Sequence, residues 1–218
     1  MQTKAIYHNG TQLIVYFAGW GTPPSTVEHL CLPPDTDLLI CYNYQDLSLN
    51  VDFSAYQGIK LVAWSMGVWA ADQVMAGVPL LSATAINGTG APCHDQFGIP
   101  TAIFQGTLEG LNESNLVKFQ RRMCGDKTVF QQYQQLEGLQ SAVENQQELT
   151  ALYQGIQQPS AQAVRWTKAV IGQQDRIFPP ENQQRYWQSY FGQHSDHIVE
   201  SALPHYPFAA FSHWAELC

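Results

Sequence analysis

LVAWSMGVWAA (61–71) is the stretch of sequence that decides the fold. Apolar residues typical of a buried strand run into Ser65, and an alanine-rich segment typical of a helix follows at once. Ala63 and Gly67 flank the serine, so that A-W-S-M-G differs by one methyl group from the G-x-S-x-G turn that exposes a nucleophile. Two interpretations compete here. Ser65 is either an ordinary helix N-cap or an activated nucleophile at a strand-to-helix turn.

The rest of the chain repeats the alternation of strand and helix. Apolar runs predict strands in six segments, and a seventh, 98–106, is weaker because Pro100 interrupts it. The six segments are 11–19, 37–44, 58–65, 80–88, 162–175 and 196–205. Residues 66–77 predict a helix. This rhythm indicates an α/β fold, with a mostly parallel sheet and helices on both faces.

Residues 108–160 differ in character from the rest. The segment is polar and rich in glutamine, and its apolar residues recur at helical spacing. We therefore expect a helical insertion at 108–160, in a core formed by 1–107 and 161–218. A solvated helix face explains the glutamines without further assumption.

Composition narrows the classes of function. The 218 residues carry a formal charge of −8, with 45% hydrophobic and 13% charged residues. This balance favours a single globular domain and gives no support for binding nucleic acid or an anionic membrane. The five cysteines are irregularly spaced, which indicates reduced thiols and a cytoplasmic protein. No signal peptide, membrane span or metal-binding pattern is present in the sequence.

Two further residues complete a possible catalytic set. Asp175 follows a predicted strand, in VIGQQDRIFPP (170–180), and a helix is expected after the prolines. His205 follows the last predicted strand and lies between two prolines in SALPHYPF (201–208). Each has a simpler explanation, an Asx-turn for the aspartate and a surface turn for the histidine. His194, His197 and His213 are rivals; we place them before the last strand, inside it and in a final helix, respectively.

The order Ser65, Asp175, His205 is the chain order of α/β-hydrolases. A serine hydroxyl is a poor nucleophile unless a base removes its proton, and a carboxylate must orient that base. An oxyanion hole is also needed. We expect its backbone donors to be Met66, directly after the serine, and Trp20, in the glycine-rich loop FAGWGTPP (17–24).

Seven short stretches together resemble the BioG-type pimeloyl-acyl carrier protein methyl ester esterases of bacterial biotin synthesis. They are AGWGTPP, AWSMG, INGTG (86–90), GIP (98–100), FQRRMCG (119–125), the Asp175 loop with IFPP (177–180), and PHYPF (204–208). The resemblance implies an α/β-hydrolase with a helical lid, without a cofactor. It also implies a carboxylesterase that releases methanol from pimeloyl-acyl carrier protein methyl ester. Ser65 would be its nucleophile, Asp175 its acid and His205 its base.

The distribution of positive charge supports a protein-borne substrate. Four of the ten Lys and Arg residues lie close together within the expected lid: Lys118, Arg121, Arg122 and Lys127. Such a cluster on an acidic protein would attract an acidic carrier protein, although a solvated helix face explains it as well.

Other functions remain open at this point. They are a thioesterase or general short-chain esterase with the same triad, a binding protein on a hydrolase scaffold, and a cysteine hydrolase using Cys93 with the adjacent His94 and Asp95. We expect a monomer.

Overall fold

The computed structural model describes residues 1–158 and 164–218. Its strands form one seven-stranded sheet in the order β1-β3-β2-β4-β5-β6-β7. Only β1 is antiparallel, to β3, and every other neighbouring pair is parallel. The strands are β1 (Gln2–Ile6), β2 (Gln12–Phe17), β3 (Thr36–Tyr42), β4 (Gly58–Trp64), β5 (Ser82–Ile86), β6 (Lys168–Gly172) and β7 (Ile198–Ser201). The expected mostly parallel sheet is confirmed.

The strands that could be predicted from the sequence are those that are buried. The central strands β2, β3 and β4 are mostly apolar because both of their faces are covered. Strand β1 was not predicted. Its sequence, QTKAI, is polar, and its first three residues are exposed at the edge of the sheet.

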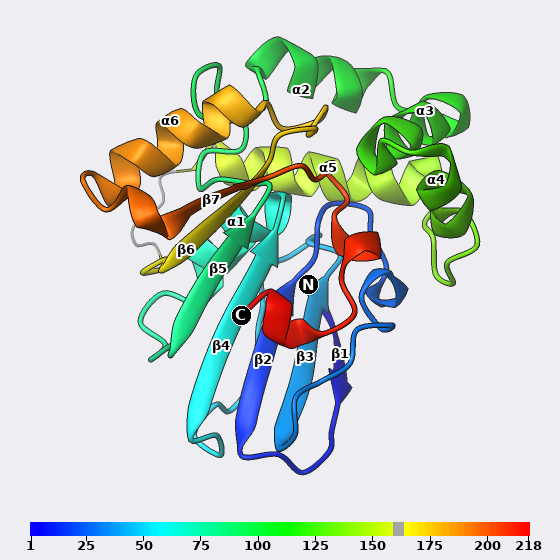
Figure 1. The fold of residues 1–218 in the computed structure, drawn as a ribbon. Coiled ribbons are helices and arrows are strands. Elements are labelled where there is room, and N and C mark those ends of the chain that lie inside the picture. The colour runs from blue at the N-terminus through cyan, green and yellow to red at the C-terminus, as the bar shows by residue number, and fades with distance from the viewer. Residues whose placement is uncertain (159–163) are drawn as a thin grey trace.

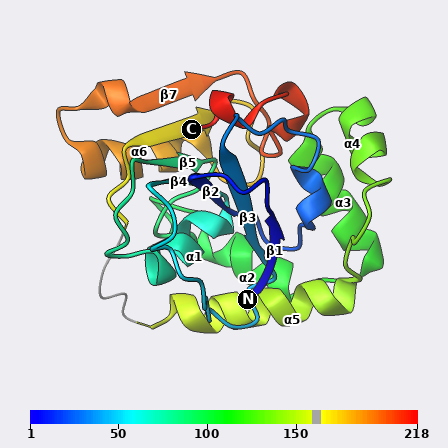
Figure 2. The same cartoon turned by 90° about the horizontal axis from the view of Figure 1, so that it is seen from below.

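Helices and short turns cover the two faces of the sheet (Figure 2). Helix α1 (Met66–Val74) packs against β2 and β4, and α6 (Pro180–Phe191) packs against β6 and β7. The C-terminal segment lies over the face of the sheet opposite to the face that α1 covers. The expected final helix is wrong, because this tail forms only two 3-10 turns, η3 (Phe208–Ala210) and η4 (Trp214–Glu216). Trp214 is buried there against Tyr16, with ring centroids 5.3 Å apart.

Four helices form a layer above the carboxyl ends of the parallel strands (Figure 1). They are α2 (Thr101–Glu109), α3 (Glu113–Cys124), α4 (Lys127–Tyr133) and α5 (Ala142–Ile156). Side chains cap three of them, since Asn112, Asp126 and Ser141 each accept a backbone N–H of the first turn. The layer therefore lies at the edge of the sheet where parallel folds bind their ligands.

Two sequence-based predictions concern this region, a strand at 98–106 and a boundary at 160/161. The weak strand at 98–106 is wrong, because Pro100 caps the start of α2 and the helical run begins at Thr101, before residue 108. The expected boundary between insertion and core, at 160/161, lies outside the described residues.

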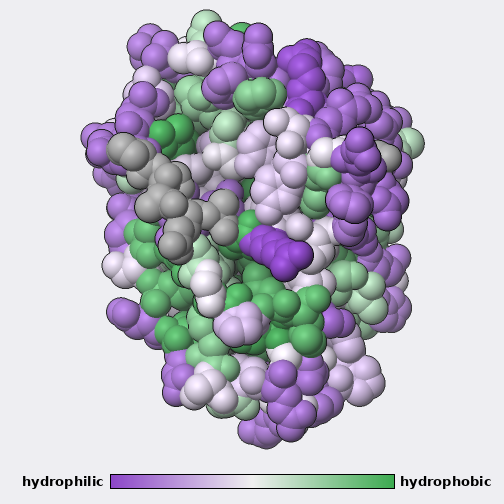
Figure 3. All heavy atoms as spheres, turned by 90° about the vertical axis from the view of Figure 1, so that its left-hand side faces the viewer, coloured by the Kyte–Doolittle hydropathy of each residue, from purple (hydrophilic) through white to green (hydrophobic). Residues whose placement is uncertain are grey.

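Helices that could span a membrane are absent from the described part of the chain. Within the described residues, every helix is too short or too polar to cross a bilayer. Hydrophobic side chains gather over the lower half of the face drawn in Figure 3, surrounded by hydrophilic ones. Leu81, just before β5, is 62% exposed.

Candidate active site

Ser65 occupies a sharp turn between β4 and α1. Its φ of 57° and ψ of −124° are strained for a residue with a side chain, and such strain is typical of nucleophile turns. The turn requires close backbone approach. A Cβ on Gly67 would lie 2.4 Å from the Phe17 carbonyl oxygen, and one on Gly88 would lie 2.3 Å from the Ser65 carbonyl oxygen. Glycine at 67 and 88 therefore permits the turn.

Ala63 replaces the first glycine of the usual pattern without disturbing this geometry. It lies within β4, fully buried, and pairs with Ala85 of β5 on one side and Phe17 of β2 on the other. The small Ala85 neighbour leaves room for one methyl group.

The Ser65 hydroxyl does not cap helix α1. Its Oγ lies 3.0 Å from Nε2 of His205, and Nδ1 of the same ring lies 2.8 Å from Oδ2 of Asp175. An ionised carboxylate can only accept, so Nδ1–H donates to Asp175 and Nε2 is free to accept the serine proton. The structure thus brings together the three residues that the chain order suggested, and all three are buried.

Asp175 is held by donors from the segment that follows it. The backbone N–H groups of Ile177 and Phe178 each donate to Oδ1 at 2.8 Å. Gln183, on α6, donates from Nε2 to Oδ2 at 3.1 Å. With the histidine, four hydrogen bonds fix both oxygens of this carboxylate.

Two side chains that were not predicted as site residues donate hydrogen bonds to the backbone carbonyl of the histidine. Trp64 donates from Nε1 to the His205 carbonyl at 2.7 Å, and its ring lies 5.4 Å from the imidazole. Asn87, at the end of β5, donates to the carbonyls of Pro204 (2.9 Å) and His205 (3.0 Å) and accepts the Gly172 N–H (2.7 Å). The signal for Asn87 was an asparagine directly after a strand, where its φ is 47°.

A partly enclosed pocket lies next to Ser65. Trp20 and Met66, the residues predicted to supply the two backbone donors, are among those that line it. Within the described part of the chain, neither backbone N–H has a protein acceptor. The remaining lining is mostly apolar, from Ile99, Ile103, Phe104, Phe119, Met123, Leu149 and Ile177. The site therefore combines a hydroxyl and a base with an apolar pocket, and two of the residues that line it have backbone N–H groups without a protein acceptor among the described residues.

The four basic residues of the sequence analysis surround a second hollow, beside the first. Lys118, Arg121, Arg122 and Lys127 line it together with Arg176, which the sequence analysis did not single out. Arg122 and Arg176 line both hollows. All five side chains are exposed, and the carboxylate beside them, Asp126, already caps helix α4. This basic cluster, the five residues named here, thus borders the mouth of the active-site cavity.

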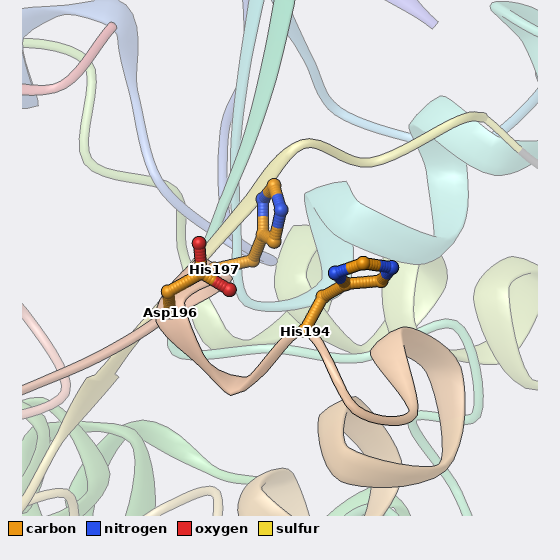
Figure 4. A group of neighbouring side chains, drawn as sticks. All are labelled: His194, Asp196 and His197. Carbon is orange, nitrogen blue, oxygen red and sulfur yellow. The ribbon is translucent and has the colours of Figure 1, made fainter.

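The rival histidines lie elsewhere. His194 directly precedes the turn η2 (Ser195–His197), and His197 is its last residue. Strand β7 begins at the next residue, so the prediction that His197 lies inside the strand is wrong. Figure 4 shows them with Asp196. His194 and Asp196 are exposed and His197 is partly exposed, and none of the three lines the Ser65 cavity. Ligand atoms of these three lie within 4.8 Å of one another, the one group of this kind among the described residues. Nδ1 of His197 is 2.6 Å from the Thr167 carbonyl.

In the described part of the chain, Cys93 makes no hydrogen bond with His94 or Asp95. Nδ1 of its neighbour His94 accepts the backbone N–H groups of Gln96 and Phe97, and Asp95 accepts that of Thr101. None of the three residues lines the Ser65 cavity.

Comparisons with known proteins place the chain beside a described family. The model of a family described as "Pimeloyl-ACP methyl esterase BioG" matches residues 1–217. The chain is 51% identical to the crystal structure of BioG from Haemophilus influenzae, covering 100% of this chain and 99% of that one, with a TM-score of 0.92.

Two other relatives are more distant or only partly covered. A malonyl-[acyl-carrier protein] O-methyltransferase of Bacteroides fragilis is 45% identical over 182 residues, which are 82% of this chain but 37% of that protein. A lipase-esterase related protein from Clostridium acetobutylicum is 11% identical over 92% of this chain and 88% of its own, with a TM-score of 0.56, which shows a shared fold alone.

Proposed function

The chain belongs to the BioG family of α/β-hydrolases, ester-processing enzymes of biotin synthesis, and on this basis we propose that Ser65, His205 and Asp175 hydrolyse the methyl ester of pimeloyl-acyl carrier protein. The observation that carries the proposal is the buried line of hydrogen bonds from Ser65 Oγ through His205 to Asp175, at the end of an apolar cavity. The products are methanol and pimeloyl-acyl carrier protein.

The reaction has two halves. Oγ of Ser65 attacks the ester carbonyl as Nε2 of His205 takes its proton, and the tetrahedral oxyanion accepts the N–H groups of Trp20 and Met66. His205 returns the proton to the methoxide, which leaves as methanol. Water, deprotonated by the same nitrogen, then attacks the acyl-serine, and His205 returns that proton to Ser65 Oγ as the carboxylic acid product is released. Asp175 holds the imidazole in the required tautomer and stabilises its positive charge.

The acyl chain suits the shape of the site. A methyl ester at the far end of a carrier-bound chain must reach Ser65 while the carrier protein stays outside. The apolar lining accommodates the methylene groups, and the basic cluster at the mouth faces the phosphate of the carrier arm and the acidic carrier protein. In this proposal α2 to α5 act as the lid, with residues 108–160 as its main part.

The chemistry of the Bacteroides relative fits the same substrate class. A methyltransferase acting on carrier-bound malonyl groups forms a methyl ester, and a methyl esterase removes one. The chain spans just over a third of that relative, and we assign no methyltransferase activity to it. We further propose that the enzyme works as a monomer in the cytoplasm. The three residues of the proposed triad come from one chain, which supports a monomer. The five cysteines of the chain are unpaired, which supports a reducing compartment.

A panel of three substrates tests the proposal. Pimeloyl-acyl carrier protein methyl ester is compared with free dimethyl pimelate and with an acyl thioester on the same carrier. We expect the highest kcat/KM on the first. Preferred cleavage of the thioester would make the protein a thioesterase, and equal rates on both methyl esters would remove the role of the carrier.

Reversing two charges tests carrier binding separately. Arg121→Glu combined with Arg122→Glu replaces two attractions by repulsions, and we expect kcat/KM on the carrier substrate to fall about 5- to 150-fold. Hydrolysis of p-nitrophenyl acetate should stay nearly unchanged. The loss should shrink from 0.1 M to 1 M salt, as the Debye length falls from about 10 Å to about 3 Å. Arg165→Glu, exposed and away from both hollows, is the matched control. Equal losses on both esters would contradict a docking role.

A further inference from the structure

The lid helix α5 holds the loop that carries the Trp20 N–H. Glu148, in the middle of α5, is fully buried. Its Oε2 accepts the backbone N–H of Gly21 at 3.2 Å, and its Oε1 accepts that of Tyr44 at 3.1 Å. One carboxylate thus connects the lid to the segments that follow β2 and β3.

Asn145, one helical turn before Glu148, makes a second connection. Its carbonyl accepts Nε1–H of Trp20 at 2.8 Å. Its side-chain oxygen fills the space beside Gly21, where a Cβ would lie 1.8 Å from it. Gly21 also has a φ of 68°, which favours glycine. The loop therefore packs tightly on α5, and Gly21 makes the close approach possible.

Tyr44 holds the same loop from the side of the sheet. Its hydroxyl donates to the Ala18 carbonyl at 2.7 Å, and its ring stacks on Phe17 with centroids 6.5 Å apart. The carbonyl of Ala18, the indole of Trp20 and the N–H of Gly21 thus all have partners. Among the described residues, the backbone N–H of Trp20 has no protein acceptor, and Trp20 lines the cavity.

A carboxylate is an expensive group to bury here, and its chemistry explains its presence. Burial raises the pKa of Glu148 to about 7, while its hydrogen bonds from Tyr44 and Gly21 act in the opposite direction. Both oxygens are needed as acceptors, because they face two backbone N–H groups. A glutamine of the same shape would accept only one and would turn its own N–H₂ toward the other.

We infer that Glu148 is a positioning residue for ester hydrolysis, acting through the loop 19–21 to aim the Trp20 N–H at the oxyanion. The lid is then part of the catalytic frame as well as a cover. This inference rests on the proposed serine mechanism, because an oxyanion forms only if Ser65 attacks a carbonyl.

Glu148→Gln tests the inference without a change of side-chain volume. Loss of a whole oxyanion donor costs about 10²- to 10³-fold in kcat, so a misaimed donor should cost about 10- to 100-fold. KM should stay within about twofold, because the acyl chain binds in the ground state without this contact. Binding of a trifluoromethyl ketone, whose adduct with the serine carries the oxyanion, should weaken by the same factor as kcat.

Glu144→Gln is the matched control. It lies one turn earlier on the exposed side of α5, in a capping box that glutamine also satisfies, and it should keep kcat and ketone binding. Wild-type kcat and ketone affinity in Glu148→Gln would overturn the inference.

A second variant covers the case in which Glu148→Gln fails to fold. Trp20→Phe keeps an aromatic ring in the cavity wall and removes the indole donation to Asn145, and it should also weaken ketone binding more than KM. Unchanged ketone binding would overturn the inference. If the wild-type enzyme itself formed no ketone adduct, the proposed serine mechanism would be wrong, which is a distinct result.

Discussion

Replacing Asp175 by asparagine changes one acceptor oxygen into a donor in a site enclosed by donors. Oδ1 can keep the N–H groups of Ile177 and Phe178. The new N–H₂ then faces Nε2 of Gln183 and Nδ1 of His205, which lie 3.1 Å and 2.8 Å from Oδ2 in the native protein. The least costly response is for the imidazole to accept at Nδ1 and to carry its proton on Nε2. That nitrogen, 3.0 Å from Ser65 Oγ, can then no longer take the serine proton.

The magnitude follows from this change of tautomer. Asparagine in place of the aspartate of a serine triad lowers kcat by about 10⁴. Stability should fall far less, by about 1–3 kcal/mol for an imperfectly paired buried amide. The activity loss is therefore not an unfolding effect, and thermal unfolding measured alongside the kinetics will separate the two.

The assay is the initial rate on p-nitrophenyl acetate and on the carrier-bound methyl ester, with intact mass checked for deamidation of the new asparagine. Asp95→Asn is the control. Asp95 is exposed and accepts one backbone N–H, from Thr101, at 2.8 Å, so an amide oxygen can replace it. If Asp175→Asn kept more than roughly a tenth of the wild-type kcat, the orienting role of the carboxylate would be refuted.

The remaining predictions concern the nucleophile, its turn and pH. Ser65→Ala and His205→Ala should each lower kcat by about 10⁴ to 10⁶ in folded protein, measured by ester hydrolysis and circular dichroism. Ala63→Gly should keep activity whereas Ala63→Val should lose it, because valine adds bulk beside a fully buried turn; an active valine variant would argue against a crowded turn. The pKa of buried Glu148 is raised to about 7 from an ordinary value of 4.5, so its contribution to stability is present below about pH 4.5 and is lost as pH rises through 7. Titration of Glu148 should lower the free energy of unfolding by about 3 kcal/mol between pH 4.5 and pH 8, and this decrease should be absent in Glu148→Gln. An identical pH dependence of unfolding in both proteins would contradict a raised pKa for Glu148.

The sequence predicted the fold because its central strands are buried on both faces. Strands β2 to β5 are mostly apolar and buried, and the turn at Ser65 requires small neighbours that can be read directly from the sequence. Strand β1 escaped prediction because an exposed edge strand carries no such run. The strand expected at 98–106 failed because Pro100 starts helix α2 there, and apolar residues at helical spacing were mistaken for a strand.

The site was predictable only in part, for a similar reason. Ser65, Asp175 and His205 each follow a strand, and the topology of a parallel sheet brings such positions to one edge. Glu148 could not be found this way. It lies in a polar, glutamine-rich helix and resembles its exposed neighbours, and only the packing of α5 on the loop after β2 shows that it is buried. Arg176 was not predicted to belong to the basic cluster, because the other residues that line the same hollow, such as Arg121 and Arg122, are far away in sequence.

The central claim is that Ser65 attacks a carrier-bound methyl ester, and rapid-quench mass spectrometry of enzyme and carrier protein in one mixture tests it most directly. We expect pimeloyl-acyl carrier protein methyl ester to lose the mass of one methylene group, as the ester becomes an acid. The peptide containing Ser65 should carry the acyl group transiently, and Ser65→Ala should show neither change. Conversion of the carrier substrate by Ser65→Ala at a rate near that of the wild type, or an acyl group found on Cys93 instead, would contradict the account.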